Sequence, residues 1–324
     1  MHNNNAAQWL IDRNIEQGYG EAIAVRFRRT TRSYADVMRA TWRVQNTLRD
    51  LGVREGERVV VLANDGPDMV AWFLGCLRAG VIAVPVSPLL SGEQVGDVAR
   101  EAGATLLVVS APFRFFIDAA ARRTPSLFQA VVIDDAGRLA TSTIGGPTVV
   151  SWSDYGDDSP APVSAVTSDG AAFHFYPSSG SKTPEAPTRV VATHAQIHSQ
   201  ATKYVHILDH LSATDRVYGL PKLHMPVGIE CSLIVPFCFG ASVVLEPGRS
   251  ASARGLCEAV ASEAATVFFL DSATARNIVE GDVERATLSS LHTVVLVDDG
   301  DDGIAQRFSD RFGPRVVQVP PEPT

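Results

Sequence analysis

The amino-acid sequence predicts an α/β fold with two packed sheets flanked by helices. Apolar runs of strand length alternate with segments whose apolar residues recur at helical spacing. This alternation occurs twice, before and after residues 138–168, a stretch rich in Ser, Thr, Pro, Gly and Asp that we interpret as an irregular connection. The 324 residues are 45% hydrophobic and 20% charged, which is typical of a globular protein with a sizeable core.

In the first half, residues 35–51 carry apolar side chains near a 3.6-residue period, so we expect an amphipathic helix that ends at Gly52. The strand-length runs are apolar on both faces, which indicates a parallel sheet covered by helices on both sides. The expected strands are 58–65, 81–86, 105–110 and 130–134, and the further expected helices are 68–80 and 92–103.

The second half repeats the pattern. A strand at 171–176 precedes a polar loop, and a helix is expected at 193–208. Further strands are expected at 232–240, 241–246, 266–270, 293–297 and near 316–319, with helices around 252–264, 272–280 and 303–312.

Composition argues against several classes of protein. The net charge of -8 at pH 7 disfavours nucleic acid or an anionic membrane as a partner, and the apolar runs are too short for a membrane span. The N-terminus has no basic segment followed by an apolar one, so no signal peptide is expected.

We interpret the four cysteines as reduced thiols of a cytoplasmic protein. Because no catalytic triad or metal-ligand spacing is found, we assign no catalytic residue and no metal site.

The segment YPSSGSKTPEAPTRVVATH, residues 176–194, is a candidate phosphate loop. Its hydroxyls and glycine backbone N–H groups suit a polyphosphate. It lacks the GxxxxGK[ST] spacing of a Walker loop. The residues alone therefore leave open a solvated turn between sheet elements.

This loop resembles the signature S-G-[ST]-T-G-x-P-K-G-V-x-x-[ST]-H of the adenylate-forming enzymes, which include acyl-CoA synthetases, peptide-synthetase adenylation domains and luciferases. Residues 31–91, 215–245 and 287–303 also resemble that superfamily, in the same order, and the pair Lys222-Leu223 is similar to benzoate–CoA ligases. The residues that match the loop signature are Ser179, Gly180, Ser181, Pro187, Val190, Thr193 and His194.

The resemblance implies a fold like the N-terminal domain of those enzymes, with one subunit of roughly residues 50–170 and another of 1–50 plus 185–324. It implies a reaction in which a carboxylate and ATP give an acyl-AMP, followed by thioester formation with CoA. The resemblance implies ATP, Mg²⁺ and CoA as cofactors. It implies a small aryl or acyl carboxylate as the substrate.

The loop departs from the family pattern where charge matters. It is two residues longer, Thr188 stands at the family's Lys, and Arg189 stands at the following Gly. A Lys brings a full charge to a phosphate, whereas Thr brings a hydroxyl. Lys182 or Arg189 can replace that charge only if the fold brings it near; otherwise the loop no longer grips pyrophosphate. The resemblance assigns to the nucleotide Ser179, Gly180, Ser181, Lys182, Thr183, Thr188, Gly300 and Asp301.

Gly300 and Asp301 belong to the acidic segment 297–302, which resembles the family's adenine-binding SAGEAL-type stretch. Gly300 keeps the family's glycine and Asp301 replaces its Glu. Four carboxylates around one glycine would oppose a nearby triphosphate unless Mg²⁺ intervened. A solvated acidic loop is the alternative.

The acyl pocket of the benzoate-type enzymes corresponds to His224, Met225, Val227 and Gly228. Gly228 fits a close approach of substrate or of backbone. His224 is either a polar pocket residue or a histidine satisfied within the core or at the surface.

The last residues, VVQVPPEPT, align where the family continues into a Y-G-x-T-E motif whose Glu helps hold Mg²⁺. We therefore expect a truncated N-terminal domain that lacks most of the β-barrel and the C-terminal lid domain. The expected function is a benzoate–CoA ligase-like protein that is inactive alone or depends on a partner protein supplying the missing domain. The alternative is a pseudoenzyme that binds an aryl or acyl carboxylate or another protein. A homodimer or heteromer is expected if the last strand, near Val316–Val319, leaves an edge unpaired. The alternative is a monomer in which Pro320, Pro321 and Pro323 protect that edge.

Overall fold

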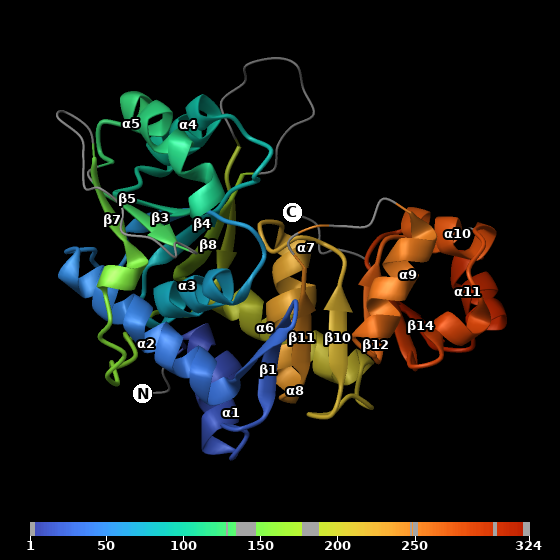
Figure 1. Ribbon diagram of the computed structural model, residues 1–324. Helices are drawn as coiled ribbons and strands as arrows, with labels where there is room; N and C mark the ends of the chain where they lie inside the picture. The colour runs from blue at the N-terminus through green and yellow to red at the C-terminus, as the bar shows by residue number, and fades with distance from the viewer. Residues whose placement is uncertain are drawn as a thin grey trace. The chain divides into compact units, whose positions relative to one another are not determined.

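The computed structural model describes residues 4–127, 129–133, 147–176, 188–246, 248, 252–300 and 303–319. Contacts divide the chain into two compact units. The first unit is Met1–Gly18 with Ala35–Gln200, and the second is Tyr19–Tyr34 with Ala201–Thr324. Each unit holds one sheet with helices around it, which confirms the predicted α/β class (Figure 1). Within the described residues, no helix is both long and apolar enough to cross a membrane.

The sheet of the first unit is parallel except at one edge. The chain runs from β3 to β4 on one side and from β5 to β6 to β7 on the other, and the hairpin of β8 and β9 closes the β4 side. Its described strands, in spatial order, are β7 (Thr148–Ser151), β6 (Gln129–Ile133), β5 (Leu106–Ser110), β3 (Arg58–Leu62), β4 (Ile82–Pro85), β8 (Ala171–Phe175) and β9 (Val190–Thr193).

The sheet of the second unit follows the same connection scheme. Here the chain runs from β10 to β11 on one side and from β12 to β13 to β14 on the other, and the hairpin of β1 and β2 closes the β11 side. Its described strands, in spatial order, are β14 (Arg315–Gln318), β13 (Thr293–Leu296), β12 (Val267–Leu270), β10 (Arg216–Gly219), β11 (Ser242–Leu245), β1 (Ile23–Phe27) and β2 (Thr30–Ser33).

Helices connect successive parallel strands, because such strands need a crossover that returns the chain to the starting edge. In the second unit, α9, α10 and α11 gather beside β12 and β14 (Figure 1). The described helices are η1 (Gln8–Asp12), α1 (Arg13–Glu16), α2 (Tyr34–Asp50), α3 (Pro67–Arg78), α4 (Gly92–Ala102), η2 (Ala111–Phe116), α5 (Ile117–Arg123), η3 (Trp152–Asp154), α6 (His194–Ile207), α7 (Pro226–Ile229), η4 (Glu230–Ile234), α8 (Val235–Phe239), α9 (Ala253–Ser262), α10 (Ser272–Glu280), η5 (Arg285–Leu288) and α11 (Ile304–Phe312).

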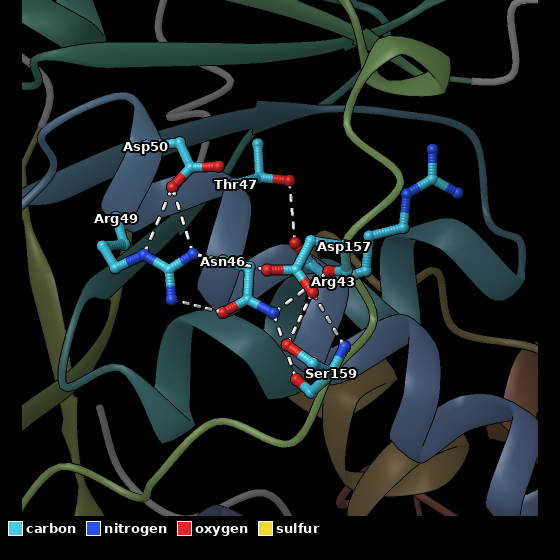
Figure 2. A network of polar contacts seen from close by, with 7 residues as sticks. All are labelled: Arg43, Asn46, Thr47, Arg49, Asp50, Asp157 and Ser159. Atoms are coloured by element: carbon cyan, nitrogen blue, oxygen red, sulfur yellow. Dashed lines mark hydrogen bonds and ion pairs between the residues drawn. The ribbon is translucent and has the colours of Figure 1, made fainter.

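The prediction of an irregular connection over 138–168 was partly wrong, because β7 and η3 fall inside it. The residues after η3 lie along α2 instead of pairing in the sheet. The side-chain amide of Asn46 donates to the backbone carbonyls of Asp157 at 3.0 Å and Ser159 at 3.1 Å, as Figure 2 shows. Side chains of α2 thus satisfy carbonyl groups that have no strand partner.

The predicted strand at 232–240 was also wrong, because the chain there is helical in η4 and α8. Its apolar residues are buried on every side, so the run has no polar face to reveal a helical period. The helix ends at Gly240, whose φ of 67° suits a left-handed C-terminal residue. Strand β11 then begins at Ser242, close to the expected start of the next strand.

Candidate functional site

The connections of the second sheet create a switch point between two adjacent parallel strands. After β10 the chain turns towards β11, whereas after β12 it turns the opposite way towards β13. In open α/β sheets, ligands bind outside the carboxyl ends of the strands at such a point. Residues 220–225 follow β10 there, and Asp271 follows β12. The sequence-predicted acyl segment therefore starts at the position that topology favours for a ligand.

Gly228 is required by the backbone at this edge. A Cβ atom on Gly228 would lie 1.8 Å from the carbonyl oxygen of Lys222 and 3.0 Å from the backbone nitrogen of Leu223. Helix α7 can therefore lie over the turn that follows β10 only because residue 228 has no side chain. Of the two close approaches that the sequence allowed, the structure shows the one to backbone.

Two polar contacts join β10 and the turn after it to Glu246, the residue that follows β11. The Lys222 ammonium group donates to the carbonyl oxygen of Glu246 at 2.7 Å. The Tyr218 hydroxyl donates to the Glu246 carboxylate at 2.8 Å. The sequence did not predict the contact of Tyr218 with Glu246. The two residues are far apart in the chain and meet only because β10 and β11 pair, so no local spacing indicates the contact.

The other acyl-segment residues differ in accessibility. Met225 precedes α7 and is 43% exposed, which is unusual for a large apolar side chain in this protein. His224 and Val227 are half-buried, and Val227 packs against buried side chains of the second unit. Met225 is thus the member of the predicted acyl pocket that is most exposed to solvent. Contact of any of these residues with a substrate stays a prediction.

Gly300 lies on the neighbouring strand end, after β13. A Cβ atom there would be 2.6 Å from the Ser272 hydroxyl, and the Gly300 carbonyl accepts hydrogen bonds from Ser272 Oγ at 3.2 Å and Gln318 Nε2 at 2.9 Å. Asp298 accepts the backbone N–H of Ser272 at 2.9 Å, at the N-terminus of α10. A carboxylate is stabilised there by the helix dipole. The solvated acidic loop is therefore not the right description of Asp298, although Asp299 is exposed.

The predicted phosphate loop is only partly described. Thr188, just before β9 in the first unit, is exposed. The other loop residues that the resemblance assigned to the nucleotide lie outside the described residues, and so does Asp301. The structure brings together Gly300 and the acyl segment at one sheet edge of the second unit. The nucleotide role of Thr188 stays a prediction.

The end of the loop signature has a structural role in the first unit. Thr193 and Gln196 cap α6 reciprocally: Thr193 Oγ1 accepts the Gln196 N–H at 3.1 Å and Gln196 Oε1 accepts the Thr193 N–H at 2.8 Å. His194 is 2% exposed, and its Nδ1 accepts the backbone N–H of Ala6 at 3.1 Å. Burial lowers the pKa of His194 to about 4, so its ring is neutral at pH 7.

Thiol and metal chemistry find little support in the described parts of the chain. Burial raises the pKa of Cys76 to about 12, which disfavours the thiolate needed for nucleophilic attack. No group of three or more His, Cys, Asp or Glu residues among those described is arranged to hold a metal ion. Gly300 O and Asp298, which lie at the adenine-type segment, are already engaged with Ser272.

Comparison with known proteins finds relatives among the aryl–CoA ligases. A 3-hydroxybenzoate/4-hydroxybenzoate–CoA ligase of Thauera aromatica is 28% identical over 313 residues, which are 95% of this chain and 58% of the ligase. A benzoate–CoA ligase of the same organism is 27% identical over 246 residues, covering 76% of this chain and 44% of the ligase. The chain thus spans about half the length of these relatives.

Solved structures share the fold. A benzoate CoA ligase from Burkholderia xenovorans LB400 superposes with a TM-score of 0.81 at 22% identity, over 98% of this chain and 60% of that one. An anthranilate CoA ligase in complex with anthranoyl-AMP gives 0.82 at 24% identity, with the same coverage. The model of the AMP-binding enzyme family matches residues 11–319. The chain therefore belongs to the AMP-binding enzyme family.

Proposed function

We propose that this chain is a CoA ligase-like member of the family that binds a small aryl carboxylate at the carboxyl edge of the second sheet. The observation that carries the proposal is the contact of Gly228 with the Lys222 backbone. That contact seats His224 and Met225 beside the switch point between β10 and β12. The relatives named as hydroxybenzoate, benzoate and anthranilate ligases support an aryl acid as the substrate class.

The chemistry of this edge suits such a ligand. The exposed Met225 side chain offers an apolar, adaptable surface for a ring. The Lys222 ammonium lies in the same turn, and a cation near the ligand favours a carboxylate. The half-buried imidazole of His224 gives a polar group for ring substituents.

For the nucleotide we propose weak binding. Thr188 brings a hydroxyl where the family has an ammonium, so the carboxylate should bind more tightly than ATP–Mg²⁺. When bound, ATP would supply the adenylyl group, and CoA would take up the activated acid. The substitutions at residues 188 and 189 favour a second candidate function as well, in which the chain binds the acid without catalysis.

Isothermal titration calorimetry tests the proposal. We expect benzoate, 3-hydroxybenzoate or 4-hydroxybenzoate to bind, and hexanoate, which lacks a ring, to bind more weakly. The change His224→Ala should weaken aryl-acid binding about tenfold, the effect of losing about 1.4 kcal/mol. The matched control is His206→Ala, which removes an exposed histidine near the end of α6 in the same unit and should change nothing. Micromolar binding of ATP–Mg²⁺ with no binding of any acid would contradict the proposal.

A further inference from the structure

A cavity of about 570 Å³ lies in the first unit, where the N-terminal helical segment meets the start of α6. Its volume is within the range of small-molecule sites, about 300–1,000 Å³. The switch point of the second sheet contributes none of its walls. The lining residues are Asn4, Asn5, Ala6, Gln8, Trp9, Arg13, Ser168, His194, Ala195 and His198.

Among the described residues, the lining is rich in hydrogen-bond donors and contains no carboxylate. The whole chain carries a net charge of -8, yet the described part of the cavity wall includes one guanidinium, two imidazoles and side-chain amides and no Asp or Glu. The Arg13 Cζ lies 4.3 Å from the centroid of the Trp9 ring. The His198 ring stands 5.3 Å from that ring, centroid to centroid. Positive charge is thus held against an aromatic wall.

His194 adds a directed donor. Its Nδ1 accepts the Ala6 N–H, and a neutral imidazole that accepts at one nitrogen carries its hydrogen on the other. The hydrogen therefore sits on Nε2. No hydrogen bond within the described chain uses that atom, although the residue is 2% exposed. This donor is available to an acceptor, and the His194 side chain lines the cavity.

We propose that this cavity binds a small organic oxyanion, separately from the carboxylate site of the second unit. The oxyanion accepts the Nε2–H of His194 and pairs with Arg13, and the apolar body of the ligand lies against Trp9. A phosphate monoester and a carboxylate share this chemistry. Because the described lining residues include no acidic side chain, they do not repel either anion.

Two measurements test the proposal with phenyl phosphate, benzoate and inorganic phosphate as probes. The first measurement uses protein whose histidine rings are labelled with ¹⁵N. In its two-dimensional NMR spectrum, the Nε2–H signal of His194 should shift as an organic anion is added, and the shift should level off when the cavity is fully occupied. Inorganic phosphate, which has no apolar body, should bind more weakly. If phenyl phosphate binds and benzoate does not, the ligand class is a phosphate monoester; the reverse result assigns a carboxylate.

Calorimetry on variants supplies the second measurement. Arg13→Gln should weaken binding of the organic anion at least tenfold, about 1.4 kcal/mol. Arg39→Gln, which removes an exposed arginine of α2 in the same unit, should leave it unchanged. His224→Ala should leave the response of the His194 Nε2–H signal to each probe unchanged, which separates this site from the one proposed for aryl acids. The proposal is overturned if no probe shifts the His194 signal, or if folded Arg13→Gln binds the probe as the wild type does.

Discussion

At the scale of single residues, Gly228 decides how the edge of the second sheet is built. Its missing side chain leaves room for the Lys222 carbonyl, which a Cβ atom would meet at 1.8 Å. The obstacle is backbone rather than the flexible end of a side chain, so it cannot simply rotate away. Either α7 or the turn after β10 must move if residue 228 changes.

The substitution Gly228→Ala should therefore destabilise the second unit by about 1–3 kcal/mol or more, the usual cost of overpacking. Urea denaturation followed by circular dichroism measures this. The control is Gly156→Ala, because a Cβ atom on Gly156 meets nothing within 4 Å. Equal midpoints for the two variants would show that the turn relaxes freely, and would weaken the case that Gly228 fixes the site.

At the scale of elements, Asp215 ties together the amino ends of three neighbouring strands of the second sheet. It is 6% exposed and precedes β10. Its carboxylate accepts hydrogen bonds from Thr266 Oγ1, before β12, and from His292 Nε2, before β13, each at 2.7 Å. Burial alone would raise the pKa of Asp215. The hydrogen bonds from Thr266, His292 and the Ser212 N–H outweigh burial and hold that pKa below its usual value.

A group whose pKa is lower in the folded than in the unfolded chain stabilises the fold above the unfolded pKa, which for Asp is about 3.9. That contribution disappears as the pH falls through the folded pKa. Asp215→Asn should therefore lower the melting temperature at pH 6, and the difference from wild type should narrow as the pH is lowered below about 4. Thermal melts between pH 3 and pH 6 measure the difference, with Asp50→Asn, an exposed carboxylate of α2, as the control. A constant difference across that range would rule out the carboxylate's charge as the cause.

At the scale of the whole molecule, the two sheets share one spatial arrangement, in which parallel strands are closed at one edge by a hairpin. In the second sheet, residues 220–225 follow β10 and lead into α7. The loop between β8 and β9 carries Thr188 and Arg189 in place of the family's Lys and Gly. Reaction at phosphorus needs a positively charged group beside the phosphate. We therefore expect that this protein can bind an acid without catalysing its adenylation.

These 324 residues should give no pyrophosphate exchange with aryl or fatty acids. The assay measures incorporation of labelled pyrophosphate into ATP, with a complete benzoate–CoA ligase as the positive control. The double change Thr188→Lys with Arg189→Gly tests whether the loop charge is the cause of inactivity. Exchange by the wild-type chain clearly above a protein-free blank would contradict the prediction and favour an active ligase.

The sequence predicted most strands of both sheets, because parallel strands buried on both faces appear as short apolar runs between turn residues. It predicted Gly228 as a point of close approach, to substrate or to backbone, because the segment around it resembles the family's acyl-pocket segment. It failed at η4 and α8, where a helix buried on all sides has no polar face. It did not identify β2, whose residues Thr30–Ser33 are polar. The His194–Ala6 and Tyr218–Glu246 contacts join distant segments, so no local pattern announces them.

The place of β1 in the second sheet has a consequence for how the chain is made. Val25 of β1 pairs with Val243 of β11, and almost all of the first unit lies between them in the chain. As the polypeptide leaves the ribosome, the β1–β2 hairpin emerges early and must wait for its partner strand while the first unit is synthesised and can fold. A hairpin alone is marginally stable in water, and domains fold in the order of synthesis. The second sheet can therefore be completed at this edge only after almost all of the first unit has been synthesised.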